Sequence, residues 1–273
     1  MGDKIEADKN MNGIRLNKFI SEAGFCSRRE ADRLIEQRRV TIDGQAAQMG
    51  SRVQAGQTVK IDGRPLKKEK ERILLAVNKP RGVVCTTDKK WGDQTVDDLI
   101  CYPKRVFSIG RLDKESEGLL LMTNQGDILN KILKAGNAHE KEYLVTVDKK
   151  ITEDFLKKMA KGVYLPELEV TTKPCRVMLA GEKRFRIILT QGLNRQIRRM
   201  CEALHYQVTK LVRVRIMNIE LGDLPSGSCR SVTKKEYAEL MNRLRDSSNH
   251  PGGYQQQKHV KTGRNRRLNE SEN

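Results

Sequence analysis

The sequence predicts an α+β protein in which a small N-terminal module precedes a larger domain built on a mixed, mainly antiparallel β-sheet. The 273 residues are enough for one large and one small domain. The chain opens with two short helical patterns followed by a hairpin. Beyond residue 73, runs of predicted strands are separated by single helices. Because regular βαβ alternation is missing, a mixed α+β sheet is favoured over a doubly wound parallel sheet.

The first module shows helical spacing and then strand alternation. Four apolar residues recur at i, i+3, i+4 and i+7 and predict a first helix: Leu16, Phe19, Ile20 and Ala23. Ser27 and Glu30 form a capping box that begins a second helix. Asp43-Gly44 predicts a hairpin turn between short strands. We expect this module to span residues 14–64, after a flexible N-terminus over 1–13.

The remaining boundaries follow from composition. Residues 65–72, PLKKEKER, carry no apolar period and predict a charged linker, across which the two modules should move independently. We expect the larger domain at 73–245. Residues 246–273 are basic and rich in Gly, Gln and Asn, so they have little apolar surface to bury and should form a disordered tail.

The larger domain alternates between predicted strands and helices. Thr152 and Thr233 are candidate N-caps, and Gly162 lies where a C-cap is expected. The predicted strands cover residues 73–78, 83–86, 118–123, 141–147, 174–179, 184–190 and 208–220. The predicted helices cover residues 94–100, 127–134, 152–161, 194–204 and 233–244.

The net charge of +18 favours a polyanionic partner, with nucleic acid first and an acidic membrane surface second. Neither a long apolar run nor a signal-peptide core is present, which disfavours a membrane location. Six scattered cysteines without a CxxC pair indicate reduced thiols in a cytoplasmic protein and disfavour a metal site. No phosphate-loop or dinucleotide fingerprint supports a nucleotide cofactor. We expect a monomer, because the positive field opposes self-association.

One acidic residue lies in an unusual setting. In the segment 110–126, GRLDKESEGLLLMTNQG, Asp113 follows Arg111, precedes Lys114 and leads into an apolar run that predicts a buried strand. Taken alone, a loop aspartate is usually a solvated one. An acid at the mouth of a buried strand and between two cations is nevertheless better suited to chemistry than to stability.

The same segment resembles the catalytic motif of the RsuA-like superfamily of ribosomal-RNA pseudouridine synthases. Further blocks follow in the superfamily's order: NKPRG at 78–82, HEKEYLVTV at 139–147 and QGLNRQIRRM at 191–200. Residues 14–62 resemble the S4 RNA-binding domain. The strings KILKAGNAHEKEYLVTVDK and GLNRQIRRMCEALHY favour the F-type enzymes of large-subunit rRNA. The resemblance implies conversion of a 23S rRNA uridine to pseudouridine without a cofactor, with a tyrosine-tRNA anticodon uridine as a second candidate.

The resemblance also implies three catalytic residues. Asp113 would be the nucleophile, and Tyr143 would stack beneath the target uracil. Arg198 would pair with Asp113, which needs a nearby cation because burial raises the pKa of an aspartate. Read without the resemblance, Tyr143 is an ordinary core tyrosine and Arg198 belongs to a solvated basic helix face.

Candidate RNA-binding residues surround these positions. Arg111 should fill the stack vacated by a flipped uridine or hold the RNA backbone. In the strand predicted at 208–220, alternation puts Leu211, Arg213 and Arg215 on one face, which we expect to line an RNA cleft. Lys79 is a further candidate phosphate contact. The other RNA-binding candidates are Leu112, Lys114, Arg195, Gln196 and Ile197 near the motifs, with Arg28, Arg29 and Arg33 in the first module.

Three other functions remain to be compared. A non-catalytic S4-type RNA-binding or ribosome assembly factor would share the basic charge but would not need Asp113. A glycoside hydrolase needs two carboxylates flanking a sugar bond, and Asp113 and Glu115 are too close in sequence for that arrangement. A zinc deaminase would need H-x-E and PCxxC motifs, which this sequence lacks.

Overall fold

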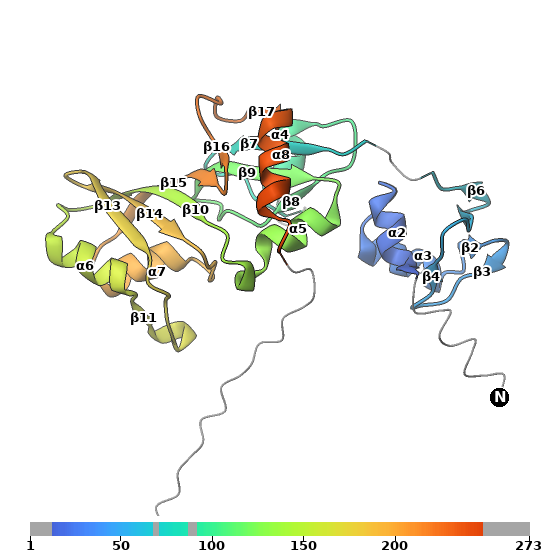
Figure 1. The fold of residues 1–273 in the computed structure, drawn as a ribbon, viewed down its shortest axis with the longest axis horizontal. Coiled ribbons are helices and arrows are strands. Elements are labelled where there is room, and N and C mark those ends of the chain that lie inside the picture. The colour runs from blue at the N-terminus through green and yellow to red at the C-terminus, as the bar shows by residue number, and fades with distance from the viewer. Residues whose placement is uncertain (1–12, 68–70, 87–91, 248–273) are drawn as a thin grey trace, which may run out of the picture.

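The computed structural model describes residues 13–67, 71–86 and 92–247 (Figure 1). Within these ranges the chain forms a small N-terminal module and a larger domain organised on one mixed sheet. The expected flexible N-terminus and basic tail lie outside the described residues, except for residue 13 and residues 246–247.

The N-terminal module packs two helices against short strands. Ser27 caps the second helix as expected, since its Oγ accepts a hydrogen bond from the backbone N–H of Glu30 at 3.1 Å. The apolar faces of both helices pack with Val40, Val59 and other strand residues into one core. The elements are α2 (Leu16–Glu22), α3 (Arg28–Glu36), β1 (Ile14–Arg15), β2 (Val40–Ile42), β3 (Gln45–Ala46), β4 (Arg52–Val53), β5 (Val59–Ile61) and β6 (Arg64–Pro65).

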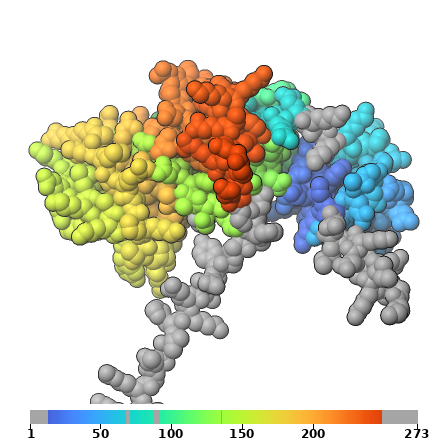
Figure 2. Space-filling model, in the orientation of Figure 1, coloured from blue at the N-terminus to red at the C-terminus, as the bar shows by residue number. Residues whose placement is uncertain are grey.

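The two modules touch each other. Lys18 Nζ of α2 lies 2.9 Å from Asp127 Oδ1 of the larger domain. Arg105 donates hydrogen bonds to the carbonyl of Cys26 and, at 3.4 Å, to Ser21 Oγ. Figure 2 shows the blue N-terminal module against the green part of the larger domain. Independent movement of the modules would therefore require these contacts to break.

The larger domain is built on a nine-stranded sheet with the order β13-β14-β10-β15-β9-β7-β17, to which β16 and β8 add at β15 and β9. The pairings are antiparallel except for β15 with β9, which run parallel. The strands are β7 (Leu74–Lys79), β8 (Phe107–Ile109), β9 (Glu117–Thr123), β10 (Lys141–Val147), β13 (Arg176–Gly181), β14 (Arg184–Leu189), β15 (Val208–Ile216), β16 (Ile219–Glu220) and β17 (Cys229–Ser231).

Each of the five predicted helices is present. Thr152 and Thr233 cap α6 and α8 through their hydroxyls, and Gly162 is the C-cap of α6. The helices are α4 (Val96–Ile100), α5 (Gly126–Leu133), α6 (Glu153–Lys161), α7 (Gln196–Ala203) and α8 (Lys234–Arg243). The short elements are η1 (Ala135–Asn137), η2 (Pro166–Leu168), β11 (Tyr164–Leu165) and β12 (Val170–Thr171).

Two strand predictions were wrong in detail. The segment 83–86 forms one isolated bridge, Val84 with Thr95, and joins no sheet among the residues that the structure describes. The strand predicted at 208–220 ends at Ile216, where a turn leads into β16. In addition, the short strands β8, β11, β12 and β17 were not predicted, since segments of two or three residues are too short to show a clear alternation.

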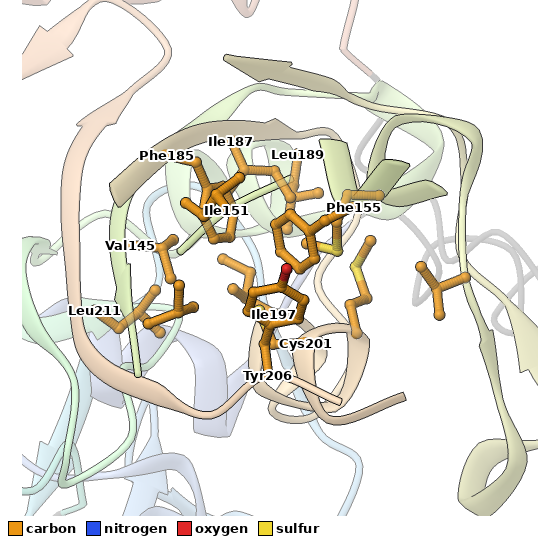
Figure 3. Close-up of a cluster of buried hydrophobic side chains, with 14 of the residues drawn as sticks. Val145, Ile151, Phe155, Phe185, Ile187, Leu189, Ile197, Cys201, Tyr206 and Leu211 are labelled. Atoms are coloured by element: carbon orange, nitrogen blue, oxygen red, sulfur yellow. The ribbon is translucent and has the colours of Figure 1, made fainter. Parts of the chain in front are cut away.

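Helices cover the two halves of the sheet separately. On the half formed by β13, β14, β10 and β15, helices α6 and α7 enclose a core around Phe155, whose ring centroid lies 5.3 Å from that of Phe185 and 4.3 Å from that of Tyr206 (Figure 3). On the other half, α5 and α8 bury Ile128 and Leu240 against β7 and β9. The strands β15 and β9 lie between the two cores, where the halves meet.

A register shift in β15 changes the alternation expected for this strand. Arg213 lies opposite Tyr143, whereas Arg215 lies opposite Glu142, so one extra residue separates the two pairs. Because such a bulge reverses which face the following residues occupy, Arg215 does not share a face with Leu211 and Arg213 as alternation predicted. Its guanidinium instead pairs with Glu140 and Glu142 at 3.1 and 2.9 Å.

Glu236, in the N-terminal cap of α8, should make a pH-dependent contribution to the free energy of unfolding. Glu236 accepts two hydrogen bonds from Arg230 and one from the Thr233 backbone, each 2.8 Å long. The bonds from Arg230 are the main cause that lowers the pKa of Glu236 from 4.5 to about 2, although burial opposes them. A carboxyl with a depressed folded-state pKa stabilises the fold above its unfolded pKa, and this contribution is lost as the pH falls from about 4.5 towards 2.

We therefore expect Glu236→Gln to lower the free energy of unfolding at pH 7 by roughly 1–2 kcal/mol, after a reduction for solvent screening. The difference from the unmodified protein should shrink below pH 4.5 in chemical denaturation curves. Glu239→Gln is the matched control, because Glu239 forms an exposed i, i+4 pair with Arg243 on the same helix. The explanation would be contradicted if both variants lowered the free energy of unfolding equally. It would also be contradicted if the effect of Glu236→Gln did not change with pH.

Candidate active site

The loop that carries Asp113 connects β8 to β9 and is held in a turn. The backbone N–H of Ser116 donates to the carbonyl of Asp113 at 3.0 Å. Leu112 is buried, whereas the Asp113 side chain retains 33% of its exposure. Asp113 thus lies on a constrained loop at the entrance to a buried strand, as the sequence predicted.

Position 118, at the start of β9, must be glycine because β15 approaches its backbone closely. Its φ is +100°, and a Cβ added there would lie 2.4 Å from the carbonyl oxygen of Arg213. A side chain would therefore force the two strands apart. The approach fixes the loop of Asp113 relative to β15.

Asp113 lines a small pocket at the junction of the two halves of the sheet. The pocket encloses about 100 Å³, below the 300–1,000 Å³ that drug-sized ligands occupy. This volume suits one inserted base. Loops, β10, β14, β15 and the first turn of α7 contribute its lining: Arg111, Leu112, Asp113, Ser116, Tyr143, Leu189, Gln191, Gly192, Leu193, Arg195, Gln196, Ile197, Arg198 and Leu211.

The cation nearest to Asp113 differs from the one predicted. Arg195 Nη1 lies 3.9 Å from Asp113 Oδ2, while Arg198 forms no ion pair with Asp113 within 4.0 Å among the described residues. Arg195 is the N-cap of α7 with a φ of +50°. This left-handed backbone takes Arg195 off the regular helix, so its position beside Asp113 does not follow from helical spacing.

Arg198 is buried beside Asp113 but donates to other groups. Its Nη2 reaches the carbonyl of Glu115 at 3.1 Å and Ser116 Oγ at 3.5 Å, and its Nη1 reaches the carbonyl of Val208. Its Nε is buried without a partner in the structure. Burial is the main cause that lowers the pKa of Arg198, and Asp113 acts in the opposite direction. Arg198 therefore holds the loop of Asp113 and keeps one donor free.

Two further cations are buried near the loop, which overturns the phosphate contacts expected of them. Lys79 is fully buried, and its Nζ donates to the carbonyls of Pro80 at 2.9 Å and Ser116 at 2.6 Å. Arg213 is 3% exposed, and its Nε donates to the carbonyl of Leu119 at 2.7 Å. Side chains enclosed in this way cannot meet a phosphate from solvent.

The other predicted residues divide by exposure. Tyr143 is half-buried in the pocket, as an aromatic platform would need. Leu112, Gln196, Ile197 and Leu211 line the pocket but are mostly buried, so little of each is available to RNA. Arg111 and Lys114 are exposed, and Lys114 pairs with Asp93 at 2.6 Å. In the N-terminal module, Arg28, Arg29 and Arg33 are exposed on α3 and lie outside this pocket.

Sequence reasoning missed Ser116 and Gln191, which both line the pocket. Ser116 is buried, and its carbonyl and hydroxyl meet Lys79 and Arg198. The sequence signal that could have identified Ser116 was its position directly before the buried strand. Gln191 accepts a hydrogen bond from the backbone of Lys173, a contact between distant segments that no local pattern reveals.

Two structural features bear on other kinds of site. In the described ranges, His, Cys, Asp and Glu side chains do not gather in groups of three or more that could hold a metal ion. Across the same residues, every helix is too short or too polar to cross a bilayer.

Known proteins match both modules. Residues 14–59 match the S4 domain model, and residues 73–203 match the model for RNA pseudouridylate synthase. A crystal structure of a pseudouridylate synthase superposes with a TM-score of 0.62 and 29% identity, covering 83% of this chain and 99% of that one.

Curated relatives agree with these matches. The dual-specificity RNA pseudouridine synthase RluF of Salmonella typhi is 52% identical over 86% of this chain and 81% of its own length. The same-named protein of Escherichia coli K12 is 51% identical over 87% and 81%. Ribosomal large subunit pseudouridine synthase B of Yersinia pestis is 35% identical over 86% and 76%. The chain is therefore a member of the RNA pseudouridine synthase family with an N-terminal S4 domain.

Proposed function

We propose that this enzyme converts a uridine of large-subunit rRNA to pseudouridine with Asp113 as the nucleophile. One observation carries the assignment: among the described residues that line the pocket, Asp113 is the one carboxylate. Asp113 and Tyr143 line the same pocket of about 100 Å³. The names of the relatives include a dual-specificity RNA pseudouridine synthase and a ribosomal large subunit synthase, and they support large-subunit rRNA as a substrate. A tyrosine-tRNA anticodon uridine is the second substrate that the sequence resemblance implies.

The reaction needs a carboxylate and no external reagent. The bond between N1 of the base and C1′ of the ribose breaks, the base turns, and C5 bonds to C1′. C5 then loses its proton and N1 gains one, so nothing is oxidised or reduced. An ionised carboxylate can attack the ribose or the base, or remove a ribose proton, and thereby starts the sequence. Asp113 is placed for this role, with the Arg195 guanidinium 3.9 Å away.

Tyr143 provides the surface on which the base turns. A uridine in folded RNA must leave its stack before a side chain can reach it, and aromatic rings stabilise an everted base by stacking. Tyr143 lies on β10 opposite Arg213 of β15, so strand pairing fixes its backbone position at the pocket. Arg111, exposed at the rim of the same pocket, is placed to contact the RNA strand from which the base has been everted.

The S4 domain supplies affinity. Arg28, Arg29 and Arg33 project from α3 into solvent. Phosphate contacts of this kind bring RNA to the enzyme without reading its sequence, and they weaken as salt increases.

Replacing Asp113 tests the assignment. Asp113→Asn should abolish pseudouridine formation in transcripts of large-subunit rRNA and tyrosine tRNA, measured by carbodiimide-stop sequencing, while thermal stability and RNA affinity stay unchanged. Glu115→Gln is the control, because Glu115 lies two residues away and is turned towards Arg81. An active Asp113→Asn protein would remove the nucleophile assignment, and an unmodified protein inactive on both RNAs would redirect the substrate.

Tyr143 variants separate stacking from proton transfer. Tyr143→Phe keeps the ring, whereas Tyr143→Ala removes it. If stacking is the main role, Ala should weaken binding of the everted base by about 1–3 kcal/mol, and Phe should retain most of the turnover. Single-turnover rates on the rRNA transcript would measure this. A Phe variant as slow as the Ala variant would assign the essential function to the hydroxyl.

The α3 arginines predict salt-dependent affinity. Arg28→Gln with Arg29→Gln should weaken binding of specific and unrelated RNA alike, and should reduce the slope of log K against log salt by about one for each phosphate that the variant no longer neutralises. Filter binding between 50 and 200 mM salt, roughly the range over which such contacts respond, would measure the slope. Lys157→Gln on α6, where Lys157 pairs with Glu153, is the control and should leave the slope unchanged. Weaker binding to one RNA only would point to base recognition instead.

A further inference from the structure

Arg213 has an environment that neither RNA binding nor stability explains. Its guanidinium is 3% exposed, and no carboxylate lies within ion-pair distance of it in the described part of the chain. Burying a cation without a counter-ion is unfavourable, and an apolar residue of similar size would be a less costly core residue. Its Nη2 is also buried without a hydrogen-bond partner.

The hydrogen bonds of Arg213 link the two ends of the loop that carries Asp113. Nε donates to the carbonyl of Leu119 at 2.7 Å, on the strand that follows the loop. Nη1 approaches the carbonyl of Arg111 at 3.5 Å, two residues before Asp113. One planar side chain therefore spans the base of the loop, with Asp113 between its two attachment points.

The backbone of Arg213 is fixed in the same place. It pairs with Gly118 in the parallel junction of β15 and β9. The Gly118 position tolerates no Cβ, which would lie 2.4 Å from the Arg213 carbonyl oxygen. Both the main chain and the side chain of Arg213 thus contact the segment that positions Asp113, from the opposite half of the sheet.

We propose, resting on the function proposed above, that Arg213 is a positioning residue for Asp113. Its guanidinium holds the carbonyl of Arg111 against β9 and so sets the place of the carboxylate in the pocket. The long contact to Arg111 and the unpaired Nη2 leave donors available when RNA binding draws the loop inwards, since catalytic hydrogen bonds are often long before substrate binds.

The proposal predicts a loss of turnover without a loss of RNA binding. Arg213→Met keeps the length of the side chain and removes every donor. We expect its single-turnover rate to fall about 100-fold, because small displacements of a reacting group have effects of this size. The KM and the RNA dissociation constant should stay within about twofold of the unmodified protein. Arg213→Lys, which restores a charge and one donor to Leu119, should recover part of the rate.

Two further measurements separate positioning from general destabilisation. Hydrogen exchange of the backbone amides over residues 110–118 should become several-fold faster in Arg213→Met. Arg230→Met is the control: it removes an arginine that pairs with Glu236 at the far edge of the sheet, and it should lower the melting temperature without changing the rate or loop exchange. If Arg213→Met does not fold, the same comparisons are made with Arg213→Lys.

Three outcomes would overturn the proposal. The first is an unchanged rate with unchanged exchange in the folded variant. The second is a higher KM and weaker RNA binding at an unchanged rate, which would make Arg213 a direct RNA contact. The third is loop exchange that rises equally in Arg230→Met. If Asp113→Asn instead proved active, the proposal that Asp113 is the nucleophile would fail. Hydrogen exchange over residues 110–118 would still show whether Arg213 holds the loop in place.

Discussion

The contact between β9 and β15 at Gly118 is the constraint on which the site depends. In the order of the described strands, this pairing joins the half of the sheet under α5 and α8 to the half under α6 and α7. Asp113 comes from one half, whereas Tyr143 and Arg195 come from the other. The pocket exists because the two backbones approach closely enough to exclude a Cβ at Gly118. A side chain at position 118 would move Asp113 away from Tyr143 by separating the two strands.

The buried cations around the loop, Lys79, Arg198 and Arg213, donate to carbonyl oxygens and form no ion pair with a carboxylate among the described residues. Lys79 bonds to the carbonyl of Ser116, Arg198 to that of Glu115, and Arg213 to that of Leu119. Buried charges in such settings are unfavourable for stability, because carbonyl dipoles offset only part of the hydration that burial removes. The arrangement instead fixes the backbone on both sides of Asp113 from three directions. Such an arrangement fixes the position of the Asp113 carboxylate before any substrate binds.

Local sequence patterns predicted the helices and their caps well. The side chains of Ser27, Thr152 and Thr233 each accept a hydrogen bond from a backbone N–H within the next helical turn. The meeting of Asp113 with Tyr143 in one pocket was also predicted, although through the resemblance and not through spacing. The pairing of Asp113 with Arg195 could not be predicted in this way. It depends on the left-handed backbone of Arg195 itself, directly before α7. The burial of Lys79 and Arg213 and the bulge in β15 depend on strand pairing across long sequence separations, which no local period records.

The structure separates the charges that attract RNA from the charges that shape the site. A net charge of +18 produces a long-range field, and exposed side chains such as the arginines of α3 and Arg111 are accessible to phosphates. The buried side chains of Lys79 and Arg213 are enclosed, and they donate to backbone carbonyls near the loop of Asp113. Added salt screens exposed charges much more than enclosed ones. Affinity should therefore vary with ionic strength, whereas the rate of the bound complex should vary less, because the cations that hold the loop of Asp113 are themselves buried.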